Sequence, residues 1–404
     1  MLRLLRPPLA ASFLRRLAAA VLVLLVVCGG SVADGAGVAD DARAPDGIAR
    51  QGRAESAQVA KLPPVQHVFV LMLENQNASS TFASHSQAPY LAQTLTAQGA
   101  FLPNYYGIGH ASLGNYVALV SGQAPNERTQ LDCPLFADFV PQQPGLDAHG
   151  QVLGLGCVYP DIVKTLPDQL EAARLTWKGY MEDMGSDPNR ERATCGHPQI
   201  GTQDYTLIAT AKDKYAAKHN PFVYFHTIID DPTRCDAHVV NLEALPQDLR
   251  SKATTPNYVF ITPNLCNDGH DPDCIDGAPG GFTAIDAFLR KWVPLITASP
   301  AFKRDGLLII TFDESEGNGP EGATACCGER PLASARRPAG FIGPGGGRIG
   351  AVLLSRYIKP GTVSTVPYNH YSLLRTVEDI FGLTHLGYAA EPDLQPFGAD
   401  VFTH

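Results

Sequence analysis

The sequence is poor in basic residues. It carries 31 Lys and Arg residues against 40 Asp and Glu residues, a formal charge of −9 at pH 7. Extended binding to nucleic acid or to anionic lipid depends on clustered Lys and Arg side chains that displace counterions. The composition therefore disfavours nucleic acid as a partner, whereas a small, locally bound anion remains compatible with it.

The hydrophobic run near the N-terminus is too short to span a bilayer. Residues 17–28 form an apolar run of only twelve residues, whereas a membrane-spanning helix needs about 20. Four arginines precede this run and small residues follow it at positions 31–33. The pattern predicts a secretory signal peptide over residues 1–33, and a secreted or periplasmic protein without stable membrane insertion; a short membrane anchor is the alternative. Without this leader, 27 basic and 40 acidic residues remain, a formal charge of −13.

The cysteines lack a CxxC pair with a matching partner, which disfavours a zinc cluster. Cys28 lies in the predicted leader, and the other eight cysteines form an even set. In an oxidising compartment such a set predicts disulfide bonds. We predict one pairing, Cys266 with Cys274, because it would close a short loop. The adjacent Cys326 and Cys327 are expected to bond with two different partners.

No internal repeat is visible in the chain. Residues 34–60 are rich in Ala, Asp and Gly and show little periodic apolarity, so we expect a disordered lead-in there. Residues 61–404 are expected to form a single domain, although their number would also allow two smaller ones.

Short apolar segments alternate with amphipathic segments after residue 61. Strands are predicted at residues 67–73, 222–228, 258–262, 306–312 and 351–354. Helices are predicted at residues 89–98, 113–120, 166–173, 283–298 and 371–381. Continuous apolar strands separated by amphipathic helices indicate an α/β fold with a mainly parallel central sheet covered on both faces.

Acidic and amide side chains follow two of the predicted strands. Glu74 and Asn75 come directly after one strand, and Asp313 and Glu314 come directly after another. Either pair alone could simply end a strand. Because ligands gather at the carboxyl ends of parallel strands, the two pairs together can converge on one divalent cation. Oxygen ligands suit Ca²⁺, Mg²⁺ or Mn²⁺.

A hydroxyl group lies at a predicted helix start between these two pairs. Ser112 precedes an apolar helical run, and free backbone N–H groups at a helix start attract an anion. An ordinary N-cap serine is the alternative. Asn115, one turn further, could donate a hydrogen bond to an oxygen of such an anion. A hydroxyl beside a metal site indicates metal-assisted transfer of a phosphoryl group.

Three histidines are further candidates for this cleft. His270 follows the turn residues Asn267 and Asp268, His226 ends a predicted strand, and His370 opens the last predicted helix. Each could contact a bound phosphate, and each could equally be a structural histidine.

The motifs occur in the order seen in a known family. They are Glu74-Asn75, His110-x-Ser112-x-x-Asn115-Tyr116, the block from Thr262 to Asp271, Phe312-Asp313-Glu314 and Asn369-His370-Tyr371-Ser372. Over about residues 65–388 the chain resembles the phosphoesterase family of secreted acid phosphatases and bacterial phospholipases C, and within it the acid phosphatase branch. The family is similar in fold to the alkaline phosphatase superfamily. The resemblance therefore implies a three-layer α/β/α sandwich, alkaline phosphatase-like, with residues 61–404 as the catalytic domain.

The resemblance also implies roles for the candidate residues. Ser112 would be the nucleophile, and His270 would contact the phosphate or protonate the departing oxygen. The set that would hold one divalent metal ion, for which the superfamily also allows Zn²⁺, is Glu74, Asn75, Ser112, Asp313 and Glu314. Asn267 and Asp268 would shape the phosphate-binding loop, while Asn115, His226 and His370 stay candidates for phosphate contact from their positions in the sequence. Ala111 and Gly114 replace two prolines that the family usually has around the serine.

Three functions follow as hypotheses. The first is a secreted, metal-dependent acid phosphatase that hydrolyses phosphate monoesters through a phosphoserine intermediate, best at mildly acid pH because His270 would then be protonated. The second is a phospholipase C-type phosphodiesterase acting on phospholipid headgroups. The third is a secreted metal- or anion-binding protein with little turnover. The physiological substrate and the oligomeric state stay open.

Overall fold

The computed structural model describes residues 62–317, 319–322, 324–329 and 344–403. The predicted signal peptide and lead-in lie outside the described residues. Residues Gln58–His404 group by their contacts into one compact unit. Within the part of the chain that is described, no helix has both the length and the apolar character that a membrane crossing requires.

An eight-stranded sheet forms the centre of the fold, in the order β13-β2-β12-β11-β1-β10-β7-β9. The strands in chain order are β1 (His67–Leu73), β2 (Ala100–Leu102), β7 (Trp177–Met181), β9 (Val239–Asn241), β10 (Tyr258–Thr262), β11 (Gly306–Phe312), β12 (Ala351–Ser355) and β13 (Thr362–Val363). The run β11-β1-β10-β7-β9 is parallel throughout. Only β12 runs antiparallel to its neighbours among these strands, so the predicted mainly parallel sheet is confirmed.

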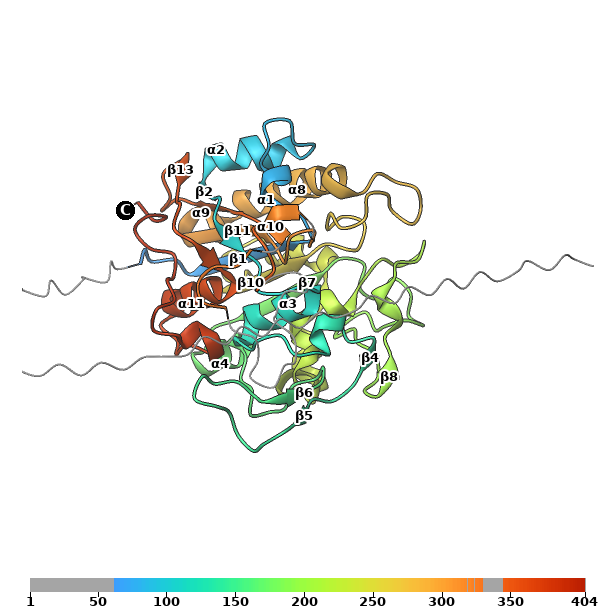
Figure 1. Cartoon of the computed structure of the whole chain (residues 1–404). Helices are drawn as coiled ribbons and strands as arrows, with labels where there is room; N and C mark the ends of the chain where they lie inside the picture. Colours follow the sequence, from blue (N-terminus) through green and yellow to red (C-terminus); the bar gives the residue numbers. More distant parts are fainter. Residues whose placement is uncertain (1–61, 318, 323, 330–343, 404) are drawn as a thin grey trace, which may run out of the picture. The chain divides into compact units, whose positions relative to one another are not determined.

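Helices cover both faces of this sheet (Figure 1). The helices α2 (Thr96–Gln98), α8 (Gly281–Ala298) and α9 (Pro300–Asp305) lie on one side, and α3 (Ser112–Ser121), α4 (Leu166–Ala172) and α11 (His370–Phe381) lie on the other. The π-helical turn η1 (Tyr90–Leu95) leads into α2 and packs on α8. The described unit is therefore a three-layer α/β/α sandwich, as expected.

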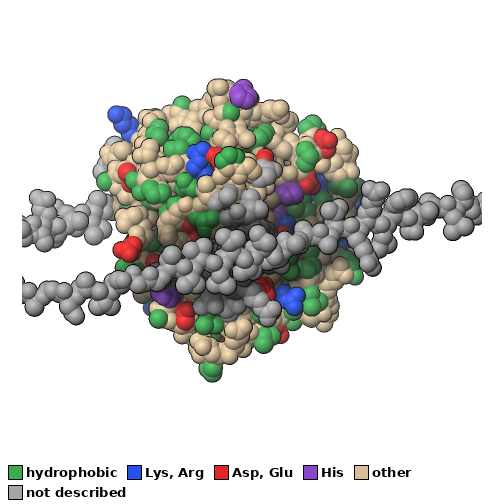
Figure 2. Space-filling view, viewed as in Figure 1, with side chains coloured by type: hydrophobic (Ala, Val, Ile, Leu, Met, Phe, Trp, Pro, Cys, Tyr) green, Lys and Arg blue, Asp and Glu red, His purple; other side chains and the backbone are tan. Residues whose placement is uncertain are grey.

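Shorter elements connect and flank these layers. The short helices are α1 (Ala78–Thr81), α5 (His226–Ile229), α6 (Pro232–His238), α7 (Leu245–Asp248) and α10 (Gly319–Gly322). The 3-10 turns are η2 (Thr129–Leu131), η3 (Tyr205–Leu207), η4 (Ala217–His219), η5 (Pro221–Tyr224), η6 (Leu242–Ala244) and η7 (Gly387–Ala390). Three small strand pairs lie outside the central sheet: β3 (Tyr105–Tyr106) with β14 (Tyr368–Asn369), β4 (Leu135–Phe136) with β8 (Thr202–Gln203), and β5 (Val140–Pro141) with β6 (Gly154–Leu155). On the face shown in Figure 2, the Lys and Arg side chains of the described residues are scattered.

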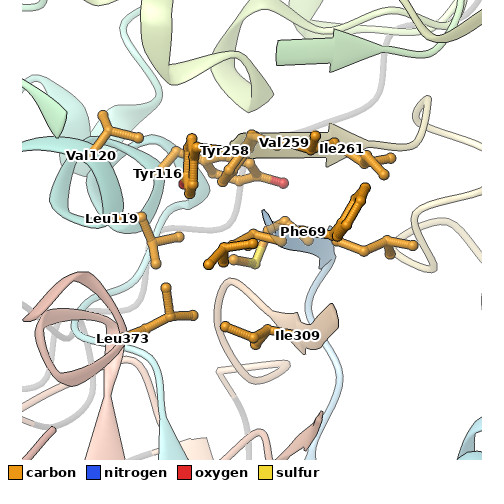
Figure 3. Packing of buried hydrophobic residues seen from close by; sticks show 14 of the residues in the cluster. Phe69, Tyr116, Leu119, Val120, Tyr258, Val259, Ile261, Ile309 and Leu373 are labelled. Atoms are coloured by element: carbon orange, nitrogen blue, oxygen red, sulfur yellow. The ribbon is translucent and has the colours of Figure 1, made fainter. Parts of the chain in front are cut away.

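The core is continuous from the sheet into the helices. Every residue of β1, β10 and β11 is buried, because helices lie against both faces of these central strands. Figure 3 shows Leu119 of α3 and Leu373 of α11 turned toward the sheet residues, among them Ile309 of β11. Burying one such side chain contributes about 1.5–3 kcal/mol to folding.

The bounds of three predicted strands, 67–73, 258–262 and 306–312, are confirmed without change. The strand predicted at 222–228 is wrong, because these residues form η5 and the helix α5. Phe222 packs on Trp177 and Phe260, with ring centroids 4.8 and 5.6 Å apart, so its apolar run covers the sheet instead of joining it. The strand that lies beside β10 in the sheet is β7. Lys178 interrupts the apolar pattern of β7.

Four disulfide bonds link the eight cysteines of the described chain. The predicted Cys266–Cys274 bond is confirmed. The expectation that Cys326 and Cys327 bond with different partners is wrong, because they bond with each other. The remaining four cysteines pair as Cys133–Cys157 and Cys195–Cys235. No other cysteine of the described chain is therefore left to bond with Cys326 or Cys327.

Candidate active site

The two acidic strand ends lie side by side. Leu73 at the end of β1 is in register with Phe312 at the end of β11, so the residues that follow, Glu74 and Asp313, leave the sheet at the same edge. The backbone N–H of Asp313 donates to the Leu73 carbonyl at 2.9 Å, and the N–H of Glu74 donates to the Asp268 carbonyl at 2.9 Å. The loop after β10 therefore joins the same edge.

Ser112 brings a hydroxyl to this edge. It begins α3 and is 1% exposed, and its Oγ donates to Glu74 Oε2 at 2.8 Å. The second oxygen of Glu74 accepts a hydrogen bond from the Tyr116 hydroxyl, one turn further along α3. Two residues of one helix thus fix both oxygens of the carboxylate.

The Asn75 side chain lies between the two carboxylates. One end of its side-chain amide lies 3.2 Å from Glu74 Oε2 and 2.9 Å from Asp313 Oδ1. With the nitrogen toward them, the amide donates two hydrogen bonds; with the oxygen toward them, the facing oxygens require a cation between them. No three or more His, Cys, Asp or Glu side chains of the described residues are grouped to hold a metal, so this set rests on two carboxylates, one amide and one hydroxyl.

The carboxylates of the site are buried and close to one another. Burial, followed by the charges of Asp313 and Asp268, raises the pKa of Glu74 well above its usual range. Burial raises the pKa of Asp313 to about 6, and the pKa of Asp268 is also raised, chiefly by burial. Crowded buried carboxylates favour protons or a metal cation among them, which fits the predicted divalent ion.

Glu314 lines the same cavity but already has a partner. Its Oε2 lies against His110 Nδ1, and His110 Nε2 lies 2.9 Å from the Gly322 carbonyl. Burial raises the pKa of Glu314 to about 8. As a metal ligand, Glu314 would act through its other oxygen.

Lys218 and His219 belong to the site but carried no signal in the sequence analysis. They form the end of η4, which packs on α3. Lys218 Nζ donates to Asp132 Oδ2 at 3.0 Å. His219 is buried with Nε2 3.4 Å from Glu74 Oε2, and neither of its ring nitrogens has a hydrogen-bond partner. Neither residue follows a strand or belongs to a quoted motif, because tertiary packing alone brings this turn to the sheet edge.

A cavity of about 290 Å³ opens above Ser112. Its lining residues are Asn75, His110, Ala111, Ser112, Asp132, Lys218, His270, Glu314, Ser315, Glu316 and Gly317. The cavity therefore joins a hydroxyl, carboxylates and a lysine, and it is large enough for a phosphate group.

His270 lies at this cavity as predicted, with 45% of its side chain exposed. Its Nδ1 lies 2.8 Å from Asp271 Oδ1, and its backbone N–H donates to Asp268 Oδ1 at 3.0 Å. Asp268 thus holds the loop that carries His270. It also lies 3.6 Å from His219 Nδ1.

Asn115 and Asn267, which were predicted to contact phosphate or shape its loop, are not among the residues that line the cavity. Asn115 Oδ1 accepts hydrogen bonds from the backbone N–H groups of Ile108 and Gly109 at 2.9 and 3.2 Å, so it braces the loop that leads to the serine. Asn267 Nδ2 donates to Glu182 Oε2 at 2.9 Å. Both amides are occupied by the protein itself.

His226 and His370 also lie outside the cavity lining. His226 pairs with Asp230 and Asp138 at 3.0 and 3.1 Å, because the strand that would have carried it to the site is a helix start. His370 is buried under the site with Nε2 2.6 Å from the Asp313 carbonyl oxygen. Burial lowers its pKa to about 4, so it supports the Asp313 backbone as a neutral ring.

Comparison with known proteins adds independent information. The family model described as "Phosphoesterase family" matches residues 74–384. The chain is 27% identical to a probable acid phosphatase from Kluyveromyces lactis over 79% of the chain and 59% of the relative. It is 24% identical to a phosphate-repressible acid phosphatase from Penicillium chrysogenum, over 72% of the chain and 54% of the relative. It is 26% identical to a phosphatidylinositol-3-phosphatase from Mycobacterium tuberculosis, over 81% of each.

The chain spans less than two thirds of the length of these fungal relatives. Among solved structures it is similar to a protein in the alkaline phosphatase superfamily from Vibrio parahaemolyticus. That similarity has a TM-score of 0.48 and 12% identity, and covers 85% of this chain and 73% of the other.

Proposed function

Because the chain belongs to the phosphoesterase family, whose model matches residues 74–384, we propose that it is a secreted, metal-dependent acid phosphatase. It hydrolyses phosphate monoesters through Ser112 and a phosphoserine intermediate. The observation that carries the proposal is the 2.8 Å hydrogen bond from Ser112 Oγ to Glu74 Oε2 at the edge where Asp313 also lies. Relatives named as acid phosphatases support the same reaction.

One divalent cation would be held by oxygen atoms of four residues, namely Glu74, Asn75, Ser112 and Asp313. The fifth predicted ligand, Glu314, is left out of this set because its carboxylate already pairs with His110. These hard ligands suit Mg²⁺, Ca²⁺ or Mn²⁺, and the number of ligands also suits Zn²⁺. When bound, the cation supplies positive charge that stabilises the serine oxygen and the phosphoryl oxygens.

The residues of the chain carry the proton and bond changes. Ser112 Oγ attacks phosphorus while its proton passes to Glu74 Oε2, the acceptor of its hydrogen bond. The bond between phosphorus and the ester oxygen breaks, and His270 at the cavity mouth gives a proton to the departing alcohol. Water then attacks phosphorus with the proton roles reversed, which releases phosphate and restores the serine. The Lys218 charge, in the same cavity, neutralises a phosphoryl oxygen.

The test is the variant Ser112→Ala assayed on phenyl phosphate. We expect kcat to fall by roughly 10³-fold or more, because the nucleophile is lost. The matched control is Ser121→Ala at the other end of α3, where the hydroxyl donates to the Val117 carbonyl at 2.7 Å; this variant should keep its activity. Full activity of Ser112→Ala would overturn the proposal. Faster turnover of phosphatidylcholine than of phenyl phosphate would instead favour the phospholipase C-type reaction.

A further inference from the structure

A second, larger cavity adjoins the one above Ser112. It has a volume of about 640 Å³ and shares Asn75, His270 and Glu316 with the smaller cavity. Its walls include the first turn of α8 and the loop that the Cys266–Cys274 disulfide closes. We call this larger space the alcohol cavity and define it by Gln76, His270, Asp273, Phe282, Thr283 and Glu316.

The position of His270 indicates which part of the substrate lies in the alcohol cavity. Phosphate bound near Ser112 and Lys218 lies in the smaller cavity, and His270 borders both cavities. An ester oxygen that takes a proton from this imidazole therefore lies at the boundary between them. The rest of the departing alcohol extends into the alcohol cavity.

The walls of the alcohol cavity are polar and offer both acceptors and donors. Asp273 and Glu316 contribute carboxylates, and Thr283 contributes a hydroxyl on the first turn of α8. Gln76 is 7% exposed; its Nε2 donates to the Gly269 carbonyl at 2.7 Å, while its Oε1 has no partner. The exposed polar residues among these four are therefore Asp273, Thr283 and Glu316.

The charge of these walls excludes some alcohols. None of the described residues that line the alcohol cavity is a lysine or an arginine, so a leaving group with its own phosphate would meet two carboxylates without a counter-charge. A neutral alcohol with several hydroxyl groups does not meet this penalty.

We propose that the alcohol cavity is the leaving-group subsite and that it selects neutral polyols, such as sugars, over alcohols that carry a second phosphate. The inference rests on the proposed phosphatase function and adds the substrate class. Hydroxyl groups both donate and accept hydrogen bonds, which matches the mixed walls. The partly buried Phe282 ring offers an apolar face for the carbon skeleton of a sugar. The volume lies within the range of about 300–1,000 Å³ that is usual for small-molecule sites.

The experiment compares kcat/KM on three esters with the full-length protein: phenyl phosphate, glucose 6-phosphate and fructose 1,6-bisphosphate. We expect glucose 6-phosphate to exceed the bisphosphate by about 10-fold or more, because the second phosphate of the bisphosphate would meet two carboxylates without a counter-charge. Thr283→Val should lower the ratio of glucose 6-phosphate to phenyl phosphate by about 3- to 10-fold, because one hydrogen bond is lost. Thr283→Trp, which fills the cavity, should lower this ratio further.

The matched control is Thr297→Val, near the other end of α8, where the hydroxyl donates to the Val293 carbonyl at 2.9 Å. Its ratio should equal that of the wild type. An unchanged ratio in both Thr283 variants, or a preference for the bisphosphate, would overturn the inference while leaving the phosphatase function intact. A protein that hydrolyses none of the three esters contradicts the phosphatase function, and the inference with it.

Discussion

Two residues beside the nucleophile depart from the usual pattern of the family, and the structure explains both departures. Ala111 has φ 66°, a conformation closed to proline, whose ring holds φ near −65°. A Cβ atom at position 114 would lie 3.0 Å from the Pro125 side chain, so Gly114 lets α3 pack closely on the neighbouring loop. The helix start that aims Ser112 is therefore held by packing and by Asn115, without either proline.

At the residue scale, we expect Lys218→Met to lower kcat/KM on phenyl phosphate by about 10²–10³-fold, because a positive charge aimed at the phosphoryl group is lost. Lys178→Met is the control, since Lys178 Nζ also pairs with an aspartate, Asp248, at 2.7 Å but does not line either cavity. Steady-state kinetics and thermal melting are measured for both. Equal kinetic losses in the two variants would show that ion-pair loss, and not phosphate contact, explains the effect.

The metal set makes a second prediction at this scale, with a readout that is independent of turnover. Added Mn²⁺ or Mg²⁺ should raise the melting temperature of chelator-treated wild-type protein, because a ligand that binds the folded state stabilises it. Asp313→Asn should abolish most of this increase. Asp305→Asn, which alters a buried aspartate paired with His67 and Lys252, should lower the melting temperature and keep the metal response. A metal response that survives in Asp313→Asn would contradict the ligand assignment.

At the scale of elements, Gly179 determines how closely the turn η5 packs on β7. A Cβ atom at Gly179 would lie 2.5 Å from the Phe222 ring. The 3-10 turn η5 can therefore press Phe222 onto the sheet only because β7 carries glycine at this position.

Gly179→Ala should destabilise the protein by about 1–3 kcal/mol, the usual effect of overpacking a core. For a domain of this size that corresponds to a drop of about 1–2 °C in melting temperature per kcal/mol. Phe222→Leu in the same chain should restore part of the loss, because the smaller side chain makes room for the added methyl group. Additive losses in the double variant would contradict this contact.

Several buried carboxylates influence the whole molecule. Burial raises the pKa of Glu378 from 4.5 to about 9, that of Glu329 to about 7 and that of Glu191 to about 8. A carboxyl group whose pKa is higher in the folded state binds its proton more tightly there. Its contribution to stability is fully present below pH 4.5 and is lost as the pH rises through the folded pKa.

The free energy of unfolding should therefore fall between pH 6.5 and 9. This window lies above the pH range in which buried neutral histidines such as His370 take up protons on unfolding. Glu378→Gln should flatten this slope, because glutamine keeps an acceptor for the Leu386 N–H, now 2.9 Å from Glu378 Oε1, without a charge. Glu243→Gln is the control, with a side chain 76% exposed in the wild type. Denaturant unfolding at four pH values measures the effect; a wild-type slope in Glu378→Gln would contradict it.

The amino-acid sequence by itself determined the strands β1, β10 and β11 and the acidic residues at their carboxyl ends. Runs of β-branched and aromatic residues are a local signal, and a parallel sheet places its strand ends at one edge wherever the strands lie in it. Ser112 could also be predicted as a site residue from the sequence, because a hydroxyl at a helix start has a local pattern.

Only the tertiary structure decided which side chains complete the site. His219 reaches Glu74 across more than a hundred residues of sequence, and Lys218 enters the same cavity, through the packing of η4 on α3; no periodicity records such a contact. Asn115 turns toward the backbone of the loop before the serine, and the helix start at His226 keeps that residue away from the cavity. Strand formation depends on neighbours along the chain, whereas the direction of a polar side chain depends on which hydrogen-bond partners the folded chain brings beside it.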